Sequence, residues 1–255
     1  MSKLTVATIN LRLSLDRWRH RRHLLVAQLV DAQPDLISLQ EISFPIGQGQ
    51  WLRRQINMRL SGQADHPYRL IQKRKRHLIK GYYEGIGILS RLPVLYHDVC
   101  GLGYGGRLAL RAHVELSFRQ GADFVATHFH HLPHAQEARL EQAMWLTGWL
   151  RTSRPVPYQI VAGDFNELPK GLAIGYIKQS FNSAYELANG YEPLATFPTA
   201  LIRPFLDWAG CVDYIFLSPP IEVMQARIFC DQPHPEDDTL YPSDHVGLIT
   251  SLRLP

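Results

Sequence analysis

Residues 158–166 read Tyr-Gln-Ile-Val-Ala-Gly-Asp-Phe-Asn, an apolar stretch followed at once by a glycine and two polar residues. A short apolar run bounded by Gly and Asn predicts a buried strand, here Tyr158–Ala162, that ends in a loop. Loops at strand ends carry many of the functional side chains of layered α/β folds. Asp164 and Asn166 are therefore candidate site residues, and similar strand ends recur along the chain.

Ten further segments have the composition of strands, because they are short, apolar and bounded by turn-forming residues. They are Leu4–Asn10, Asp35–Gln40, Tyr68–Gln72, Gly85–Ser90, Val94–Cys100, Arg107–Phe118, Asp123–Thr127, Cys211–Leu217, Glu222–Phe229 and Gly247–Leu252. Many strands and few helices predict a two-sheet sandwich with the helices outside. No repeat or linker interrupts the chain, so we expect a single domain over residues 1–255.

Helical patterns lie between these strands. Asp16 is expected to cap a helix that runs to about Asp31, with Trp18, Leu25 and Leu29 on one face. A second helix is predicted over Ala135–Leu150, where Leu140, Met144 and Thr147 are spaced i, i+4, i+7. Shorter helices are predicted near Trp51–Leu60 and Pro169–Gln179.

The composition, 45% hydrophobic and 20% charged, is that of a globular protein with a sizeable core. No apolar run approaches the roughly 18–20 residues that a membrane span needs. A strand-like segment begins at Leu4 and leaves no room for a secretion signal, so we expect a cytoplasmic protein. Cys100, Cys211 and Cys230 are widely spaced and lack CxxC patterns, which predicts buried free thiols.

The net charge of +4 is small but unevenly distributed. The stretch from Arg69 to Lys80 has six basic residues and no acid, and Arg12 to His23 has five arginines against one Asp. Asp231 to Asp244, in contrast, has five acids and no Lys or Arg. Basic surfaces attract polyanionic or phosphorylated partners. Each cluster alone is equally consistent with a solvated loop or helix face.

Polar residues recur near the expected strand ends. They are Asn10, Gln40, Glu41, Glu84, His128, Asp164, Asn166, Asp213, Ser243, Asp244 and His245. Each one alone has a structural explanation: Asn10 can cap a turn, Glu41 can be a surface acid, and buried histidines are often structural. The functional interpretation depends on the whole series and its order.

That ordered series resembles the endonuclease/exonuclease/phosphatase superfamily over nearly the whole chain. The matching motifs are Asn10, Gln40-Glu41, Gly-Ile-Leu-Ser-Arg (87–91), Thr127-His128, Gly-Asp-Phe-Asn (163–166), Asp-Tyr-Ile-Phe-Leu-Ser (213–218) and Ser-Asp-His (243–245). The resemblance implies an α+β fold, a four-layer α/β/β/α sandwich with two mixed, mainly antiparallel sheets packed face to face. It also implies a metal-dependent phosphoester hydrolase.

The resemblance implies a role for each residue. Glu41 would bind Mg²⁺ or Mn²⁺, for which carboxylates are suitable ligands, and Asn10 and Asp244 would lie beside it as ligands or supporting partners; one metal or two stays open. Asp164 would orient or deprotonate the attacking water, and Asn166 would donate to the phosphate oxygens.

Two histidine pairs are also implied. Asp213 would hold His245, which fixes the tautomer and raises the pKa of the imidazole. Glu84 would partner His128, as in the pancreatic-type DNases; AP endonucleases carry other residue types there, which argues against that class. His130, His131 and His134 follow His128, but no further ligand completes a zinc site.

Residues 101–106 are Gly-rich but do not open a helix, so they predict a hairpin turn and not a nucleotide-binding loop. Arg107, after this turn, is a candidate phosphate contact, and Tyr104 competes with it for that role.

Substrate choice depends on the loops, because one fold supports many activities. The basic 73–80 segment with Tyr82 and Tyr83 would suit nucleic acid, and the 213–218 motif is most similar to deadenylase-like and bacterial branches. We therefore expect a nuclease. The alternative is a phosphodiesterase or phosphatase for lipid headgroups or inositol phosphates. A non-catalytic binding module is disfavoured, because Glu41 and the 163–166 and 243–245 motifs are all present. No obligate protein partner is expected.

Overall fold

Two six-stranded sheets form the centre of the computed structural model, which describes residues 2–62, 66–77, 83–116, 120–202 and 209–255. The first sheet has the strand order β11-β12-β1-β2-β4-β3. Its strands are β1 (Ser2–Asn10), β2 (Leu36–Ser43), β3 (Arg69–Arg74), β4 (Glu84–Ser90), β11 (Glu222–Phe229) and β12 (Gly247–Leu254). The second sheet has the order β5-β6-β7-β8-β10-β9. Its strands are β5 (Val94–Gly101), β6 (Leu108–Glu115), β7 (Gly121–His128), β8 (Tyr158–Asp164), β9 (Asn182–Ser183) and β10 (Asp213–Leu217).

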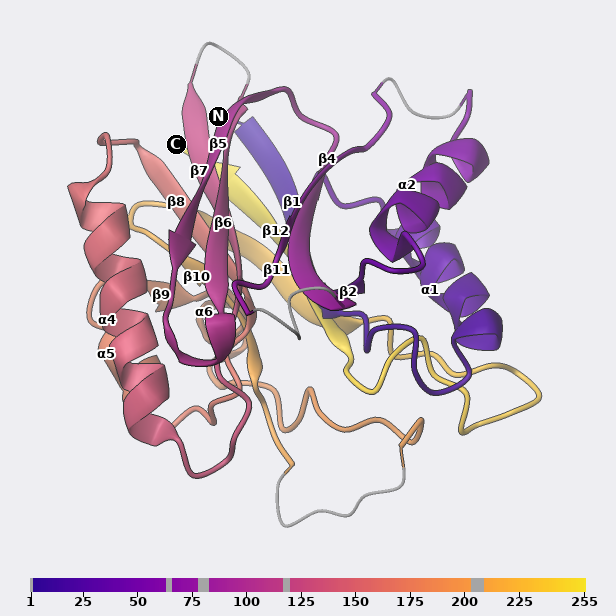
Figure 1. Cartoon of the computed structure of the whole chain (residues 1–255). Coiled ribbons are helices and arrows are strands. Elements are labelled where there is room, and N and C mark those ends of the chain that lie inside the picture. Colours follow the sequence, from indigo (N-terminus) through magenta and orange to yellow (C-terminus); the bar gives the residue numbers. More distant parts are fainter. Residues whose placement is uncertain (1, 63–65, 78–82, 117–119, 203–208) are drawn as a thin grey trace.

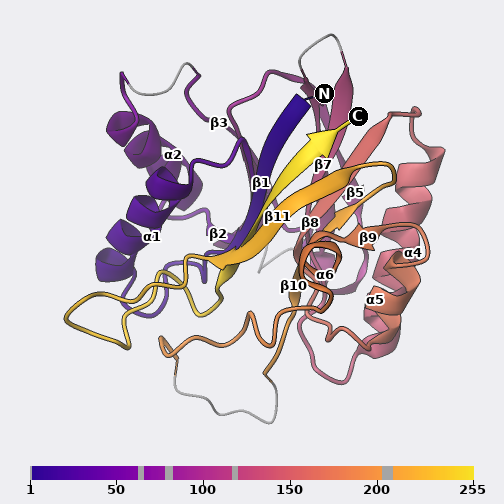
Figure 2. The ribbon, with the colours of Figure 1, turned by 180° about the vertical axis from the view of Figure 1, so that it is seen from behind.

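Both sheets are mixed and mainly antiparallel. The pairs β1–β2 and β7–β8 are parallel, whereas the other pairs are antiparallel. The sheets lie face to face, with α1 (Trp18–Ala32) and α2 (Gln48–Arg59) outside one and α4 (Gln136–Thr152) and α5 (Leu172–Ile177) outside the other (Figure 1). The turn between β5 and β6 contains the short 3₁₀ helix η1 (Tyr104–Gly106). Seen from behind, α6 (Ala184–Asn189) lies near β10 and β11 (Figure 2). The predicted α+β sandwich and the predicted hairpin turn are confirmed.

Alternating side chains along each central strand explain the layers, because both faces of these sheets are covered. In β1, Leu4 and Val6 belong to the core between the sheets, whereas Ala7 and Ile9 pack under α1 and α2. A third cluster fills the space under α4 and α5. Fully burying an aliphatic side chain stabilises a fold by about 1.5–3 kcal/mol, so these three clusters hold the strand ends in fixed positions.

The start of α1 differs from the prediction. Arg17, not Asp16, is the N-cap residue, and it has a left-handed backbone with φ of 58° and no side-chain capping bond. Asp16 instead pairs with Arg12, at 2.8 Å between its Oδ2 and the arginine Nε. The predicted buried residues Trp18, Leu25 and Leu29 do face the core.

The predicted face of α4 is wrong in part, because Thr147 is buried but the other two residues are not. Met144 is 46% exposed, and Leu140 is half-buried. The buried face instead includes Ala143, Leu146 and Leu150, together with the polar side chains of Arg139 and Gln142, which bond loop carbonyls. A polar residue with such a role is invisible to hydrophobic periodicity. The helix predicted over Pro169–Gln179 is shorter in the structure, where α5 spans Leu172–Ile177.

Among the described residues, no helix is both long and apolar enough to cross a membrane. The cysteines are free, with Cys211 and Cys230 buried and Cys100 half-buried.

Candidate active site

The candidate residues meet at one edge of the sandwich, where strand ends from both sheets converge. Asn10 ends β1, Glu84 begins β4, His128 and Asp164 end β7 and β8, and Asp213 begins β10. The sheet register places His128 beside Asp164 and Asp164 beside Asp213. Parallel neighbours end at the same edge and antiparallel neighbours begin there, so this convergence follows from the topology.

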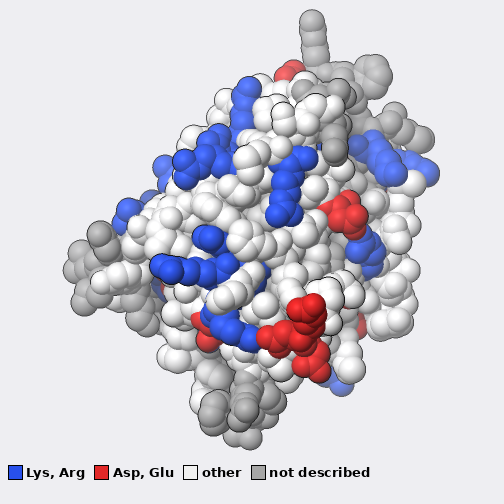
Figure 3. Space-filling model, turned by 90° about the vertical axis from the view of Figure 1, so that its right-hand side faces the viewer, with Lys and Arg blue, Asp and Glu red and all other residues white. Residues whose placement is uncertain are grey.

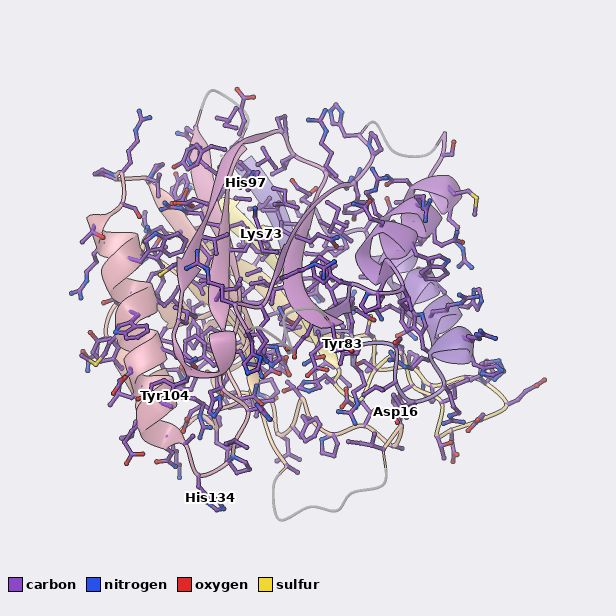
Figure 4. The ribbon with its side chains drawn as sticks, viewed as in Figure 1. Asp16, Lys73, Tyr83, His97, Tyr104 and His134 are labelled. Atoms are coloured by element: carbon purple, nitrogen blue, oxygen red, sulfur yellow. The ribbon has the colours of Figure 1, made fainter. Side chains whose placement is uncertain are left out.

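An open pocket of about 920 Å³ lies at this edge. Its lining includes Glu41, Glu84, Asp164, Asn166, Asp244 and His245, together with the cations Arg12, Lys75 and Arg107. Tyr83 and His134, which are labelled in Figure 4, line its outer part, whereas Lys73 lies higher along the sheet. The pocket therefore contains mixed charge with room for a large ligand.

Asp164 lies at the centre of the site and is contacted by four of the candidate residues. Its Oδ2 accepts from Asn10 Nδ2 at 3.0 Å, and its Oδ1 accepts from the backbone N–H of Asn166 at 2.8 Å. Two histidines flank it, with His128 Nε2 at 3.3 Å and His245 Nε2 at 4.0 Å from Oδ2. Burial, and then the charge of Asp213, raise the pKa of Asp164 to about 6. A carboxylate with a pKa near neutrality is suited to accept a proton at physiological pH.

His245 is a cation in this arrangement. Its Nδ1 lies 2.9 Å from Asp213 Oδ2, as predicted. Burial opposes the charge, but Asp213, Asp244 and Asp164 outweigh it and raise the pKa of His245 to about 10. The ring also packs against Phe197 with centroids 4.8 Å apart. Its protonated Nε2 therefore supplies fixed positive charge next to Asp164.

His128 is neutral, and its contact with Glu84 is shared with Arg107. His128 Nδ1 lies 3.5 Å from Glu84 Oε1, but Arg107 Nη1 lies 2.5 Å from the same nitrogen and 2.9 Å from the same carboxylate oxygen. Because a guanidinium only donates, His128 Nδ1 accepts and Nε2 carries the proton toward Asp164. Burial, and then Arg107 and Lys75, lower the pKa of His128 well below its usual value.

Lys75 and Arg12 are site residues that sequence reasoning missed. Lys75 is buried and its Nζ lies 3.1 Å from Glu84 Oε2, so it is not part of a solvated basic loop. Arg12 Nε lies 3.2 Å from Asp244 Oδ2, and its backbone N–H donates to Asn10 Oδ1. In the sequence, both residues stood out only as members of stretches rich in basic residues. The expected stacking residue Tyr82 lies outside the described residues, as does the rest of the 78–82 segment.

Glu41 is the best candidate for a metal ligand in the pocket. It sits at an irregularity of the β2–β4 pairing, with a left-handed backbone (φ 51°) that turns it toward the pocket. Within the described part of the chain its carboxylate has no hydrogen-bond donor, whereas Glu84 is held by Lys75 and Arg107. Burial, then Asp244 and Glu84, raise the pKa of Glu41 to about 7. A carboxylate that has no hydrogen-bond donor and lies beside two others is a suitable ligand for a hard divalent cation.

Among the described residues, two groups of candidate ligands have donor atoms within 4.8 Å of one another, namely Glu41, Glu84 and His128, and Asp164, Asp213 and His245. Both groups contain members that already bond protein partners, Asp213 with His245 and Glu84 with Lys75 and Arg107. We favour the Glu41 side of the pocket for the metal, because the Glu41 carboxylate has no hydrogen-bond donor in the described part of the chain. Asn10 and Asp244 lie next to Arg12 at this side.

Arg107 and Tyr104, the two candidate phosphate contacts, lie in different places relative to the pocket. Arg107 lines the pocket, and its Nη2 lies 3.4 Å from His131 Nδ1. Tyr104 is 46% exposed, sits in η1, and is not among the residues that line this pocket. His131 and His134 line the rim.

Two buried arginines hold the loops around the site. Arg21 is fully buried and donates to the carbonyl oxygens of Leu11, Arg12, Leu13, Leu15, Asp16 and Pro242. It thereby ties the loop after β1 to the loop that carries Asp244 and His245. Arg139 similarly bonds the carbonyls of residues 130, 132 and 133 and the carboxylate of Glu167. Neither could be distinguished from a surface helix arginine in the sequence.

The model of the Endonuclease/Exonuclease/phosphatase family matches residues 7–245. Among solved structures, an endonuclease/exonuclease/phosphatase from Bacteroides vulgatus superposes with a TM-score of 0.79 at 21% identity, covering 100% of both chains. A mannosyl-6-phosphatase from Bacteroides thetaiotaomicron gives 0.79 at 18% identity, covering 98% of this chain and 100% of that one. The human Nocturnin catalytic domain with bound sulfate gives 0.77 at 19% identity, covering 99% and 95%. No curated protein matches the chain significantly.

Proposed function

Because the chain belongs to the endonuclease/exonuclease/phosphatase family, whose members are phosphoester hydrolases, we propose that it is a divalent-metal-dependent phosphodiesterase and that its substrate is nucleic acid. The observation that carries this proposal is the placement of two differently partnered histidines around Asp164. His245 Nδ1 lies 2.9 Å from Asp213 Oδ2, and His128 Nδ1 lies 2.5 Å from Arg107 Nη1. Against the effect of burial, Asp213 raises the pKa of His245, whereas burial and then Arg107 lower the pKa of His128.

Hydrolysis of a phosphodiester needs charge neutralised on the phosphate and a water placed in line. In the proposed mechanism Asp164 orients this water and takes its proton, because its pKa is near neutrality. His128 Nε2–H and Asn10 Nδ2 hold the Asp164 carboxylate in position. The cationic His245 and one N–H of Asn166 bind the phosphate oxygens; the amide Nδ2 of Asn166 also donates to Phe129 O at 3.2 Å.

Glu41 would hold Mg²⁺ or Mn²⁺, with Asn10 and Asp244 beside it. When bound, the ion neutralises charge on the phosphate and on the oxygen that leaves. Arg107 and Lys75, which pair directly with Glu84 at 2.9 and 3.1 Å and line the pocket, would contact the substrate chain beyond the reacting phosphate.

The test is turnover of bis-p-nitrophenyl phosphate with Mg²⁺ by the wild type, Glu41→Gln and Asp164→Asn. Loss of one group from such a site costs about two or more orders of magnitude in rate, so both variants should fall by that factor. Glu222→Gln, an exposed acid on β11, and Asp31→Asn, an exposed acid on α1, are matched controls and should stay within about twofold. A wild type as inert as both variants with Mg²⁺ and with Mn²⁺ would refute the proposal.

A substrate panel separates the possible phosphoesters. Single-stranded DNA, RNA, sphingomyelin and inositol phosphates are compared at equal concentration. Preferred turnover of the lipid or of the inositol phosphates would replace the nuclease proposal and keep the hydrolase one.

A further inference from the structure

The helices α1 and α2 pack together outside the first sheet (Figure 1). They carry a surface with excess positive charge. Together they contain six arginines and one acid. Arg21 is buried, and the other five are Arg19, Arg22, Arg53, Arg54 and Arg59. Within the described ranges none of these five takes part in an ion pair. Figure 3 shows this side of the molecule, with Lys and Arg side chains spread across it and acids in smaller groups.

A hollow of about 590 Å³ opens on this surface at the N-terminal ends of both helices. Its lining includes Arg17, Arg19, Arg22, Ile46 and Trp51 and no acidic residue. Arg17 is already paired with Asp237, at 2.7 Å, so Arg19 and Arg22 are the arginines of this lining that have no ion pair within the described ranges. Arg22 lies over the Trp51 ring, with its Cζ 4.8 Å from the centroid. The site therefore offers guanidinium groups beside an apolar and aromatic floor.

A second hollow of about 730 Å³ on the same side has a different charge balance. Its lining contains Arg19 and Arg59 together with the acids Glu236 and Asp237, so it attracts a polyanion much less. Positive charge is also concentrated around His23. Its pKa is lowered, first by burial and then by Arg22, Arg59 and His20. The acid-free hollow is the one that an anionic chain would enter.

The acid-free hollow adjoins the catalytic pocket through one loop. Arg12, Leu13 and Leu15 line the pocket, whereas Ser14 and Arg17 line the hollow. Leu15 and Arg17 are two residues apart, so their Cα atoms are separated by at most about 7 Å. The two concavities therefore lie on either side of one loop, residues 12–17.

We propose that the hollow at the N-terminal ends of α1 and α2 is an extended-substrate site. It would bind the sugar-phosphate backbone of a single-stranded nucleic acid whose reacting phosphate lies beside Asp164. The inference rests on the proposed nuclease function and identifies the substrate class as a polymer. Guanidinium groups bind phosphates in a bidentate manner, and aromatic side chains beside them accommodate bases. Neither helix has a side-chain cap or an acid in its first turn, so both helix dipoles add to the positive potential.

Single-stranded nucleic acid fits this surface better than a membrane does. The arginines line a concave site that is separated from the catalytic pocket by a single loop. A membrane would need apolar side chains that protrude together.

The test measures binding of fluorescent oligothymidylates of 4 and 12 nucleotides to the full chain by anisotropy, in EDTA so that no cleavage takes place. The variants are Arg19→Gln/Arg22→Gln, the charge-retaining Arg19→Lys/Arg22→Lys, and the control Arg151→Gln/Arg154→Gln. The control removes the same charge from exposed positions at and beyond the end of α4. Each lost phosphate contact reduces the slope of log K against log salt by about 0.7 for single strands.

The inference predicts that the Gln pair weakens 12-mer binding at least about fivefold and lowers the salt slope by about 1.4, while the Lys pair keeps the slope. The ratio of 12-mer turnover to bis-p-nitrophenyl phosphate turnover should fall in the Gln pair. Equal loss in the control pair, or unchanged 12-mer binding in the Gln pair, would overturn the inference. So would a Gln pair that loses binding to phosphatidylserine–phosphatidylcholine vesicles but not to the 12-mer, because the surface would then be a membrane site. An inert wild type on bis-p-nitrophenyl phosphate would refute the proposed function, whereas normal turnover with unchanged binding would refute only the extended-substrate site.

Discussion

Replacing Glu41 by glutamine should change stability in a way that depends on both pH and metal. Burial, and then Asp244 and Glu84, raise the pKa of Glu41 from 4.5 to about 7. A group whose pKa is higher in the folded state binds its proton more tightly there. Its contribution to stability is therefore complete below pH 4.5 and is lost as the pH rises through about 7. Glutamine resembles the protonated acid and shows no such loss.

The size of the effect follows from the shift. The difference between about 7 and 4.5 is about 2.5 pKa units, which corresponds to about 3 kcal/mol. This is an upper value, because Glu41 is only half-buried by surface area and solvent screens its charge. Without metal, the free energy of unfolding of Glu41→Gln should rise relative to that of the wild type by up to about 3 kcal/mol as the pH increases from 4.5 to 8.5.

The assay is urea unfolding of both proteins in EDTA across this pH range, repeated with saturating Mg²⁺ at pH 8.5. Only the wild type should be stabilised by Mg²⁺, because a ligand that binds the folded state alone shifts the unfolding free energy. Glu222→Gln, at an exposed position, should follow the wild type throughout. A pH-independent difference between wild type and Glu41→Gln, or equal stabilisation of both by Mg²⁺, would refute the reasoning.

Three further variants test the rest of the site. Asp213→Asn should lower the pKa of His245 from about 10 toward its ordinary value, so kcat/KM above pH 8 should fall at least about 100-fold; an unchanged pH profile would contradict this. Arg107→Gln should raise the pKa of His128 in an NMR titration and slow turnover about 10- to 100-fold. Arg107→Lys should not restore turnover, because a point charge lacks the guanidinium fork. Arg21→Met should lower the free energy of unfolding by about 3 kcal/mol or more, because it leaves buried carbonyls unpaired; urea unfolding within about 1 kcal/mol of wild type would show that these bonds matter little.

The control for Asp213→Asn is Asp123→Asn, which alters a chemically similar Asp–His pair away from the site. Asp123 Oδ1 lies 2.7 Å from His113 Nδ1. Activity per folded molecule should be unchanged in this variant.

Strand positions and the polar residues at their ends could be predicted from the sequence, because a strand has a short local pattern and its ends are marked by turn residues. The Asp213–His245 pair was also predicted, and its geometry agrees with that expectation. The cap of α1 and the buried face of α4 could not be predicted, since Arg21, Arg139 and Gln142 bond backbone carbonyls that come from distant loops. Local periodicity does not register such bonds.

The sequence by itself determined the family, the sandwich and the set of candidate residues, because these depend on residue type and order. Apart from the Asp213–His245 pair, only the tertiary structure decided which charges face each other. It placed Arg107 between Glu84 and His128, Lys75 on Glu84 and Arg12 on Asp244, and it left Glu41 among carboxylates. The protonation of each group depends on burial and on neighbours within a few ångströms, and these neighbours are brought together by strand register across two sheets and not by proximity along the chain.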